Sequence, residues 1–384
     1  MQLLKGLTAT LYFSRYVHGV LIPVPDTPYL VKWTSSELVN DGVPDPFNPS
    51  HTRRIMISRY TPVRKRDCLE TCRLPYMNEF IASAEDDILQ AYVGDAVWPR
   101  GILSSLEVEM CCKERRGSGG RHPGELPLLL FGTGLNTTRL WYSSMAQNLA
   151  GMGFEVIVMD HPYETDVVQF PDGTVIYGGR VPADVNAVEE LTFALEVRAK
   201  DASLVLDRLR VPKSAKVGFV GSSFGGPAAA TAMLRDSRIA AGVNFDGAMF
   251  GAGIEAGAAR PFLLFGAAGH NTSSEDTWGR FWNATAARRP VPWMKELSVL
   301  NSSHGTYTDY PIIGEITGLN ESKELSGLGF GPVSGVWVME MMREYLSDFF
   351  RFTLKGAGEG LLAGPSDKYP EVKFLRSQGT RPRF

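Results

Sequence analysis

Continuous apolar runs alternate with segments of helical periodicity from residue 126 onward. The runs at 126–131 and 154–159 have no polar face, which is typical of strands covered on both sides of a sheet. Similar runs follow at 216–220, 239–245, 261–265 and 296–300, and helical patterns lie between or after them at 139–152, 184–209, 226–235 and 333–352. This alternation predicts an α/β fold, a mostly parallel central sheet with helices on both faces.

The chain before this region has a weaker pattern. Residues 20–125 are Pro-rich and irregular, with a strand-like run at 52–60, and we expect an N-terminal extension and the first strands of the sheet. A Gly-rich loop at 117–120 separates this part from the core strands. We predict one domain over 20–355. Residues 356–384 form a Gly- and Pro-containing, basic-ended tail that the pattern does not place.

Composition and charge narrow the function classes. The chain has 384 residues, of which 44% are hydrophobic and 21% charged, as in globular proteins with a full core. The net charge of −3 argues against a nucleic-acid partner. No later stretch reaches the ~18 apolar residues of a membrane helix. No metal-ligand constellation or phosphate-binding glycine loop is evident, so we predict neither metal nor cofactor.

The N-terminus indicates secretion. Lys5 precedes an apolar run at 6–13, and Val17-His18-Gly19 could serve as a cleavage site, so we expect residues 1–19 to be a signal peptide. Arg15 and His18 interrupt the apolar stretch, and the alternative is a cytoplasmic chain with an amphipathic first segment. Five glycosylation sequons are compatible with secretion: Asn136, Asn271, Asn283, Asn301 and Asn320.

The four cysteines predict disulfides. Cys111 and Cys112 are adjacent and poorly placed to bond each other, so each is expected to pair with Cys68 or Cys72, in an order that the sequence leaves open. A zinc site of four thiolates is the rival interpretation, although its ligand pairs usually have two or more residues between them.

The sharpest motif is Gly221-Ser222-Ser223-Phe224-Gly225-Gly226, between an apolar strand and a helix of small residues. A serine in such a strand–turn–helix setting sits on a strained turn at a helix N-terminus, the nucleophile elbow of the α/β-hydrolase fold. The flanking glycines let neighbouring backbone pass closely. We therefore predict that Ser223 is a nucleophile.

A serine nucleophile needs a base and an acid, which follow it in this fold. Of the two later histidines, His304 lies in the loop after the last predicted strand and is the preferred base, which leaves His270 as a surface or pocket-rim residue. The acid stays open among Asp246, Asp276 and Asp309, each of which follows a strand or the base.

Further site residues are predicted from position. The loop 132–136 follows the first core strand, so the N–H groups of Leu135 and Phe224 should form an oxyanion hole. Candidate substrate contacts are Thr133, Ser222 and His161, and His161 follows a core strand. The apolar, Gly-rich segment 325–337 is either a lid or lipid-contact surface, or a loop packed on the core.

These motifs resemble the secreted platelet-activating-factor acetylhydrolase family, in the style of a fungal branch. The family's elbow reads Gly-His-Ser-Phe-Gly-Gly, and Ser222 here replaces its histidine. The family's acid lies in a Leu/Phe-Asp motif that is followed by a Met-Phe pair. Residues 245–250, Phe-Asp-Gly-Ala-Met-Phe, match this motif, so the resemblance favours Asp246. The family's base loop is similar to Ser302-Ser303-His304. Its oxyanion loop, Phe-Ser-His-Gly-Leu, corresponds to residues 131–135, where Thr133 replaces the histidine.

The resemblance implies calcium-independent hydrolysis of short or oxidised acyl groups from phospholipids, with a small-molecule or lipid ester as partner and peripheral contact with lipid surfaces. Fold kinship does not fix the substrate. Two alternatives remain at this stage. The same triad could serve a secondary-metabolite acyltransferase, thioesterase or cyclase, or the chain could be a catalytically silent binding protein.

Overall fold

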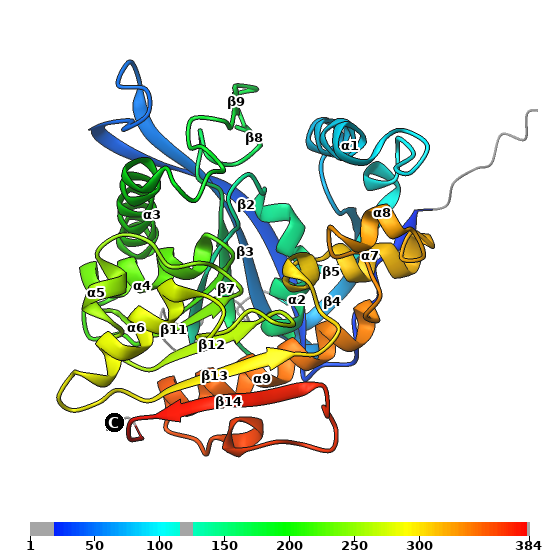
Figure 1. The fold of residues 1–384 in the computed structure, drawn as a ribbon. Helices are drawn as coiled ribbons and strands as arrows, with labels where there is room; N and C mark the ends of the chain where they lie inside the picture. Colours follow the sequence, from blue (N-terminus) through cyan, green and yellow to red (C-terminus); the bar gives the residue numbers. More distant parts are fainter. Residues whose placement is uncertain (1–18, 116–125, 382–384) are drawn as a thin grey trace, which may run out of the picture.

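The structure is a computed structural model that describes residues 19–115 and 126–381. The predicted signal peptide, apart from Gly19, and the Gly-rich loop at 117–120 lie outside the described residues. Within them, the main sheet has nine strands in the order β14-β13-β12-β11-β10-β6-β7-β3-β2 (Figure 1). The strands are β2 (Tyr29–Pro44), β3 (Thr52–Arg64), β6 (Leu128–Gly132), β7 (Glu155–Met159), β10 (Val217–Ser222), β11 (Ile239–Phe245), β12 (Phe262–Gly266), β13 (Met294–Val299) and β14 (Val372–Gln378).

The six central strands, from β7 to β13 in sheet order, are parallel, and the flanking pairs are antiparallel. Successive side chains of each central strand enter different cores. Leu129 and Phe131 belong to one hydrophobic cluster, and Leu130 belongs to a second one on the other face. Covering on both faces explains why these strands are continuous apolar runs, and it confirms the predicted α/β fold.

Helices cover both faces of the sheet (Figure 1). Residues of α3, α4 and α6 pack in one cluster, and residues of α2 and α9 pack in the other. The helices are α1 (Glu79–Val93), α2 (Ser143–Gly151), α3 (Val188–Arg208), α4 (Gly225–Arg235), α5 (Gly253–Ala256), α6 (Asp276–Ala286), α7 (Tyr310–Thr317), α8 (Lys323–Ser326) and α9 (Gly335–Lys355). Each long helical pattern in the sequence corresponds to one of these helices. The pattern at 139–152 begins as a 3₁₀ turn at residues 139–142 and continues as α2.

The N-terminal region is more regular than its sequence predicted. Strands β1 (Val20–Leu21), β5 (Leu106–Glu114) and β4 (Cys68–Pro75) form a small second sheet, and α1 connects β4 to β5. The predicted strand at 52–60 is confirmed as part of β3. A two-stranded ribbon, β8 (Val167–Gln169) and β9 (Val175–Tyr177), follows β7.

Two disulfides join β4 to β5. Cys68 bonds Cys111 and Cys72 bonds Cys112, so the two adjacent cysteines each find a separate partner, as predicted. This pairing excludes the zinc interpretation, because no thiolate is left to bind a metal.

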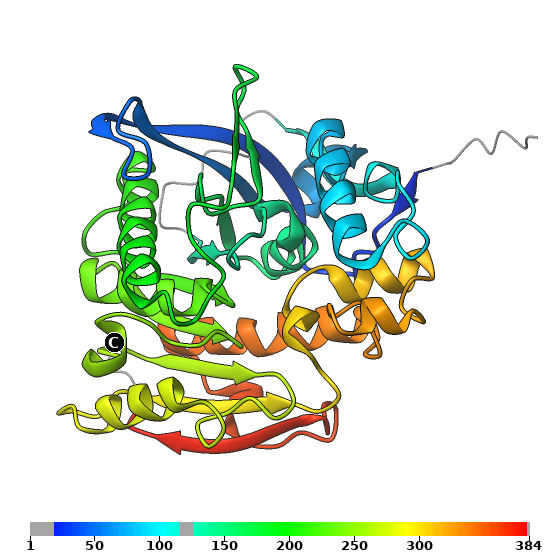
Figure 2. The same ribbon diagram turned by 45° about the horizontal axis from the view of Figure 1, so that its top comes forward.

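The C-terminal tail has a place in the sheet. Its strand β14 pairs antiparallel with β13 and forms one edge of the main sheet (Figure 1). Helices α1, α7 and α8 gather at one end of the molecule (Figure 2), where the ring centroids of Trp98 and Phe330 lie 5.3 Å apart. Among the described residues, no helix is both long enough and apolar enough to span a bilayer.

Candidate active site

Ser223 occupies a sharp turn between β10 and α4. Its φ is +52°, in the left-handed region that is unfavourable for a residue with a Cβ. The flanking glycines are required by space. A Cβ on Gly221 would lie 1.9 Å from the carbonyl oxygen of Gly225, and one on Gly225 would lie 2.1 Å from that of Gly132. The turn can therefore form only where positions 221 and 225 lack a side chain.

Three side chains form a hydrogen-bonded chain at this turn. The hydroxyl of Ser223 lies 2.8 Å from Nε2 of His304, and Nδ1 of His304 lies 2.6 Å from Oδ2 of Asp246. His304 comes from the loop after β13, and Asp246 directly follows β11 with a φ of +58°. The structure thus brings together the serine, the histidine and the acid that the resemblance favoured.

The environment of Asp246 keeps its carboxylate ionised. Burial acts to raise the pKa of Asp246. Hydrogen bonds from His270 and His304 and from the backbone N–H of Ala267 outweigh that effect and lower the pKa to about 2. An ionised carboxylate can stabilise a positive charge that develops on His304.

His270 is a residue of the site that the sequence did not predict. Its Nδ1 lies 2.7 Å from Oδ1 of Asp246, and its ring stacks on Trp278 with centroids 4.4 Å apart. It was expected at the surface or the pocket rim, and 23% of its side chain is exposed. Its position in the loop after β12, where this fold often carries its acid, was the available signal.

The other two candidate acids, Asp276 and Asp309, do not contact His304. Asp276 is exposed at the start of α6. Asp309 is buried and accepts hydrogen bonds from Tyr76 Oη at 2.9 Å and from the backbone N–H of Ser144 at 2.8 Å. Burial raises the pKa of Asp309 to about 7. It thus stabilises the first turn of α2 instead of bonding the histidine.

The loop 133–136 is held from three sides. Arg198 on α3 is fully buried, forms an ion pair with Glu164 at 2.7 Å, and donates to the carbonyl oxygens of Thr133 and Gly134. The N–H of Gly134 donates to Tyr142 Oη at 3.0 Å, and the N–H of Asn136 donates to the carbonyl of Glu164. A charged residue on the apolar face of α3 was the sequence signal for this role.

The two N–H groups predicted to form the oxyanion hole donate no hydrogen bond to the described residues. Among the described residues, no side chain or carbonyl accepts a hydrogen bond from the backbone N–H of Leu135 or of Phe224. Phe224 directly follows the serine and caps α4. Leu135 lines the same cavity as Ser223. Both N–H groups are thus available to a ligand.

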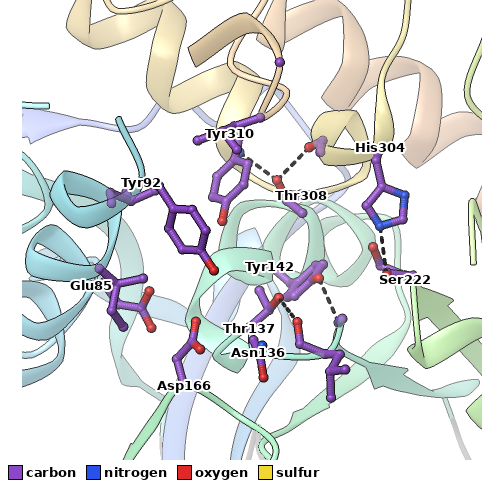
Figure 3. Close-up of a pocket in the computed structure, with 18 residues that line it drawn as sticks. Glu85, Tyr92, Asn136, Thr137, Tyr142, Asp166, Ser222, His304, Thr308 and Tyr310 are labelled. Atoms are coloured by element: carbon purple, nitrogen blue, oxygen red, sulfur yellow. Dashed lines mark hydrogen bonds between the residues drawn. The ribbon is translucent and has the colours of Figure 1, made fainter. Parts of the chain in front are cut away.

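A cavity of about 360 Å³ opens beside Ser223 and His304 (Figure 3). Its walls come from α1, the loop after β6, the segment after β7 and the segment from His304 to Leu328. The lining residues are Glu85, Ile88, Leu89, Tyr92, Gly134, Leu135, Asn136, Thr137, Tyr142, Asp166, Ser222, Ser223, His304, Gly305, Thr308, Tyr310, Gly327 and Leu328. Part of the segment 325–337 therefore packs against the site, and Leu325 and Phe330 are fully buried.

The three candidate substrate contacts differ in their positions. Ser222 lines the cavity. Thr133 is completely buried and is not among the lining residues, so its contribution is the carbonyl that Arg198 binds. His161 is also completely buried. Its Nδ1 lies 2.8 Å from Asp201, which Arg53 binds as well, so His161 belongs to a buried ion-pair network.

A mainly parallel sheet with a strained serine between a central strand and a helix is the architecture of the α/β-hydrolase class. Comparisons with known proteins agree. Residues 81–170 match the family model described as platelet-activating factor acetylhydrolase, isoform II. A protein of Arthroderma benhamiae named probable 1-alkyl-2-acetylglycerophosphocholine esterase is 37% identical over 96% of this chain and 97% of its own length. The structure of a ferulic acid esterase from Streptomyces cinnamoneus, 27% identical, covers 93% of this chain and 100% of its own with a TM-score of 0.75.

The chain therefore belongs to the platelet-activating-factor acetylhydrolase family, and it is a carboxylic-ester hydrolase. This result argues against the silent binding protein that the sequence had left open.

Proposed function

We propose that this enzyme is a serine esterase that removes short acyl groups from esters, including phospholipid esters, with Ser223 as nucleophile, His304 as base and Asp246 as the acid that orients His304. The observation that carries the proposal is the unbroken hydrogen-bond chain from Ser223 through His304 to Asp246. A serine at positive φ with a base 2.8 Å away supports a nucleophilic role more specifically than the motif alone.

In the proposed reaction, Ser223 Oγ attacks the ester carbonyl while His304 Nε2 takes its proton. The N–H groups of Leu135 and Phe224 stabilise the oxyanion, and each such donor lowers the barrier by roughly 3 kcal/mol. Protonated His304 then gives its proton to the leaving alcohol, and an acyl-enzyme remains on Ser223. Water activated by His304 releases the acid and restores the serine.

The preference for short acyl groups rests on two observations. The cavity beside Ser223 is at the small end of the range for ligand pockets, at about 360 Å³. The relative from Arthroderma benhamiae has a name that specifies an acetyl ester of a glycerophosphocholine. Contact with a lipid surface belongs to the same proposal, since a phospholipid substrate resides in one.

Secretion is also part of this proposal. Two disulfides persist in an oxidising compartment, which supports an extracellular location. Glycosylation at the predicted sequons remains a prediction. Asn283, Asn301 and Asn320 are exposed, whereas Asn136 lines the cavity, where a glycan would obstruct the substrate.

The experiment that tests the proposal is fluorophosphonate labelling with mass-spectrometric location of the label, followed by a p-nitrophenyl ester chain-length series on the same sample. We expect a label on Ser223, and turnover that is highest for short acyl chains. Ser223→Ala should lose both, whereas Ser214→Ala, in an exposed turn between α3 and β10, should keep both. Labelling without ester turnover would favour the acyltransferase, thioesterase or cyclase alternative. A folded sample that takes no label would overturn the assignment of the nucleophile.

A further inference from the structure

The end of the cavity opposite His304 is acidic. Glu85 from α1 and Asp166 from the segment after β7 lie on that side with their carboxyl groups close together in the view, and Tyr92 lies on the same side (Figure 3). Of the described residues that line the cavity, none is a lysine or an arginine. This end of the cavity therefore disfavours an anionic part of a substrate and favours a cationic one.

Glu85 has an unused acceptor at this position. The residue is only 2% exposed, and Oε2 accepts a hydrogen bond from the indole of Trp141 at 3.0 Å. Its other oxygen, Oε1, is buried and has no hydrogen-bond partner within the part of the chain that the structure describes. A buried carboxylate oxygen without a partner is costly, because desolvation is not offset by any contact. A ligand that supplies positive charge would offset this cost.

Aromatic rings complete the surroundings. Tyr92 and Tyr310 line the same cavity, and the Tyr92 side chain lies on the side of Glu85 (Figure 3). Carboxylates and tyrosine rings together form the environment that binds alkylammonium groups, through charge and cation–π attraction. The cavity also connects this end to Ser223, so one ligand can reach both.

We propose that Glu85, Asp166 and Tyr92 form a subsite for an alkylammonium group of the ester substrate. This inference rests on the proposed function, because it places the cationic group on a substrate whose carbonyl lies at Ser223. Glu85 and Asp166 supply the charge, and Tyr92 contacts the methyl or methylene groups next to the nitrogen. The subsite would thus select esters that carry a positive charge away from the reacting ester bond.

The protonation state of the subsite determines the pH at which it should be tested. Burial raises the pKa of Glu85 to about 8, with a smaller contribution from the charge of Asp166, and burial raises the pKa of Asp166 to about 7. The titratable groups that face Glu85 are Asp86, Asp160, Asp166 and Tyr310. Cation binding favours the ionised carboxylates, so the preference for a cationic ester should be stronger at pH 9 than at pH 6.

The test compares pairs of acetate esters that differ only in charge. Each ω-trimethylammonioalkyl acetate is paired with the isostere in which a tert-butyl group replaces the ammonium, over spacers of increasing length. At pH 9 we expect kcat/KM to favour the cationic ester by roughly tenfold or more at the best spacer, as for a charge-assisted contact. Because both esters react at the same triad, their ratio is independent of the ionisation of His304.

Substitutions test which residues cause the preference for the cationic ester. Glu85→Gln keeps an acceptor for Trp141, and together with Asp166→Asn it should reduce the ratio of kcat/KM for the cationic ester over its uncharged isostere to about one. Asp87→Asn is the matched control, since Asp87 lies on the same helix but is exposed and pairs with Arg100. It should keep the preference. Equal turnover of both esters by the wild type would overturn the subsite and leave the esterase proposal intact.

A binding measurement separates the two proposals if no ester is hydrolysed. Calorimetric titration of butyltrimethylammonium into Ser223→Ala requires no turnover. We expect saturable binding that is lost in Glu85→Gln with Asp166→Asn and kept in Asp87→Asn. Absence of binding at pH 9 would overturn the subsite, whatever the outcome for the nucleophile.

Discussion

His270 bonds the carboxylate of Asp246 on the oxygen that His304 leaves free. The two histidines thus share one acid, with Nδ1 of His270 at 2.7 Å from Oδ1 and Nδ1 of His304 at 2.6 Å from Oδ2. Because Trp278 stacks on the His270 ring and Ala267 donates to the same Oδ1, the carboxylate is fixed in rotation. In the proposed mechanism, His270 is therefore a positioning residue for Asp246 and His304.

Replacement of His270 by Gln should weaken catalysis without abolishing it. The lost hydrogen bond is charge-assisted, so we expect kcat to fall roughly tenfold. His304→Gln removes the proposed base itself and should cost about a thousandfold or more in kcat. Steady-state kinetics of both variants on one short ester checks this order. Equal losses would contradict the distinction between the two histidines.

The same variant should reveal a pH-dependent stability. Burial acts to lower the pKa of His270, but the hydrogen bond and charge of Asp246 raise it above 6.5. A histidine whose pKa is raised by folding stabilises the folded state at pH values below its pKa in the unfolded chain. This contribution is lost as the pH rises through its pKa in the folded state. The melting temperature of wild type should therefore exceed that of His270→Gln most clearly at pH 5, with a smaller difference at pH 9. A difference that grows with pH would contradict this sign.

Backbone strain at Ser223 can be measured separately from its chemistry. Ser223→Gly and Ser223→Ala both remove the hydroxyl, but only alanine keeps a Cβ at a φ of +52°. We expect the glycine variant to be more stable than the alanine variant by about 1 kcal/mol in urea denaturation. An alanine variant as stable as the glycine variant would mean that the turn carries no strain.

Glycine at position 225 should be indispensable. Gly225→Ala places a methyl group against the carbonyl of Gly132, so we expect loss of activity and destabilisation by about 2 kcal/mol or more. Gly358→Ala, where a Cβ would meet nothing within 4 Å, is the control and should behave as wild type. Thermal melts and ester turnover of the two variants provide the comparison.

Glu85 should make the enzyme less stable as the pH rises. Its pKa is raised from 4.5 to about 8 in the fold, chiefly by burial. Below pH 4.5 the residue is protonated in both states and has no such effect, but between these values the unfolded state ionises while the folded state does not. Glu85→Gln should therefore melt higher than wild type at pH 8 and like wild type at pH 4. An unchanged difference across this range would contradict the buried position of the carboxyl group.

The sequence was most informative where structure is local. The apolar runs of β6, β7 and β10 predict buried strands because both faces of each are covered, and the glycine spacing around Ser223 predicts the turn. The sequence pattern did not identify the acid of the site. Asp246, Asp276 and Asp309 all occupy reasonable positions along the chain, and only the three-dimensional arrangement shows which carboxylate meets His304. The resemblance to a family supplied what spacing did not.

The N-terminal region and the tail were poorly predicted for a physical reason. Strand β2 is largely exposed and contains charged residues, so it has no apolar run, and its pairing with β3 is what makes it a strand. Strand β14 likewise depends on its partner β13. His270 escaped prediction because its function arises from a contact with a residue 24 positions away.

The two disulfides enclose the segment from β4 to β5, and that segment carries α1 with Glu85 and Tyr92. Ser223, Asp246 and His304 instead follow strands of the main sheet. Neither disulfide joins a strand of that sheet. Reduction should consequently loosen one wall of the cavity while Ser223 stays in place. We therefore expect that the redox state of the surroundings alters which esters the enzyme accepts before it alters whether the enzyme can react at all.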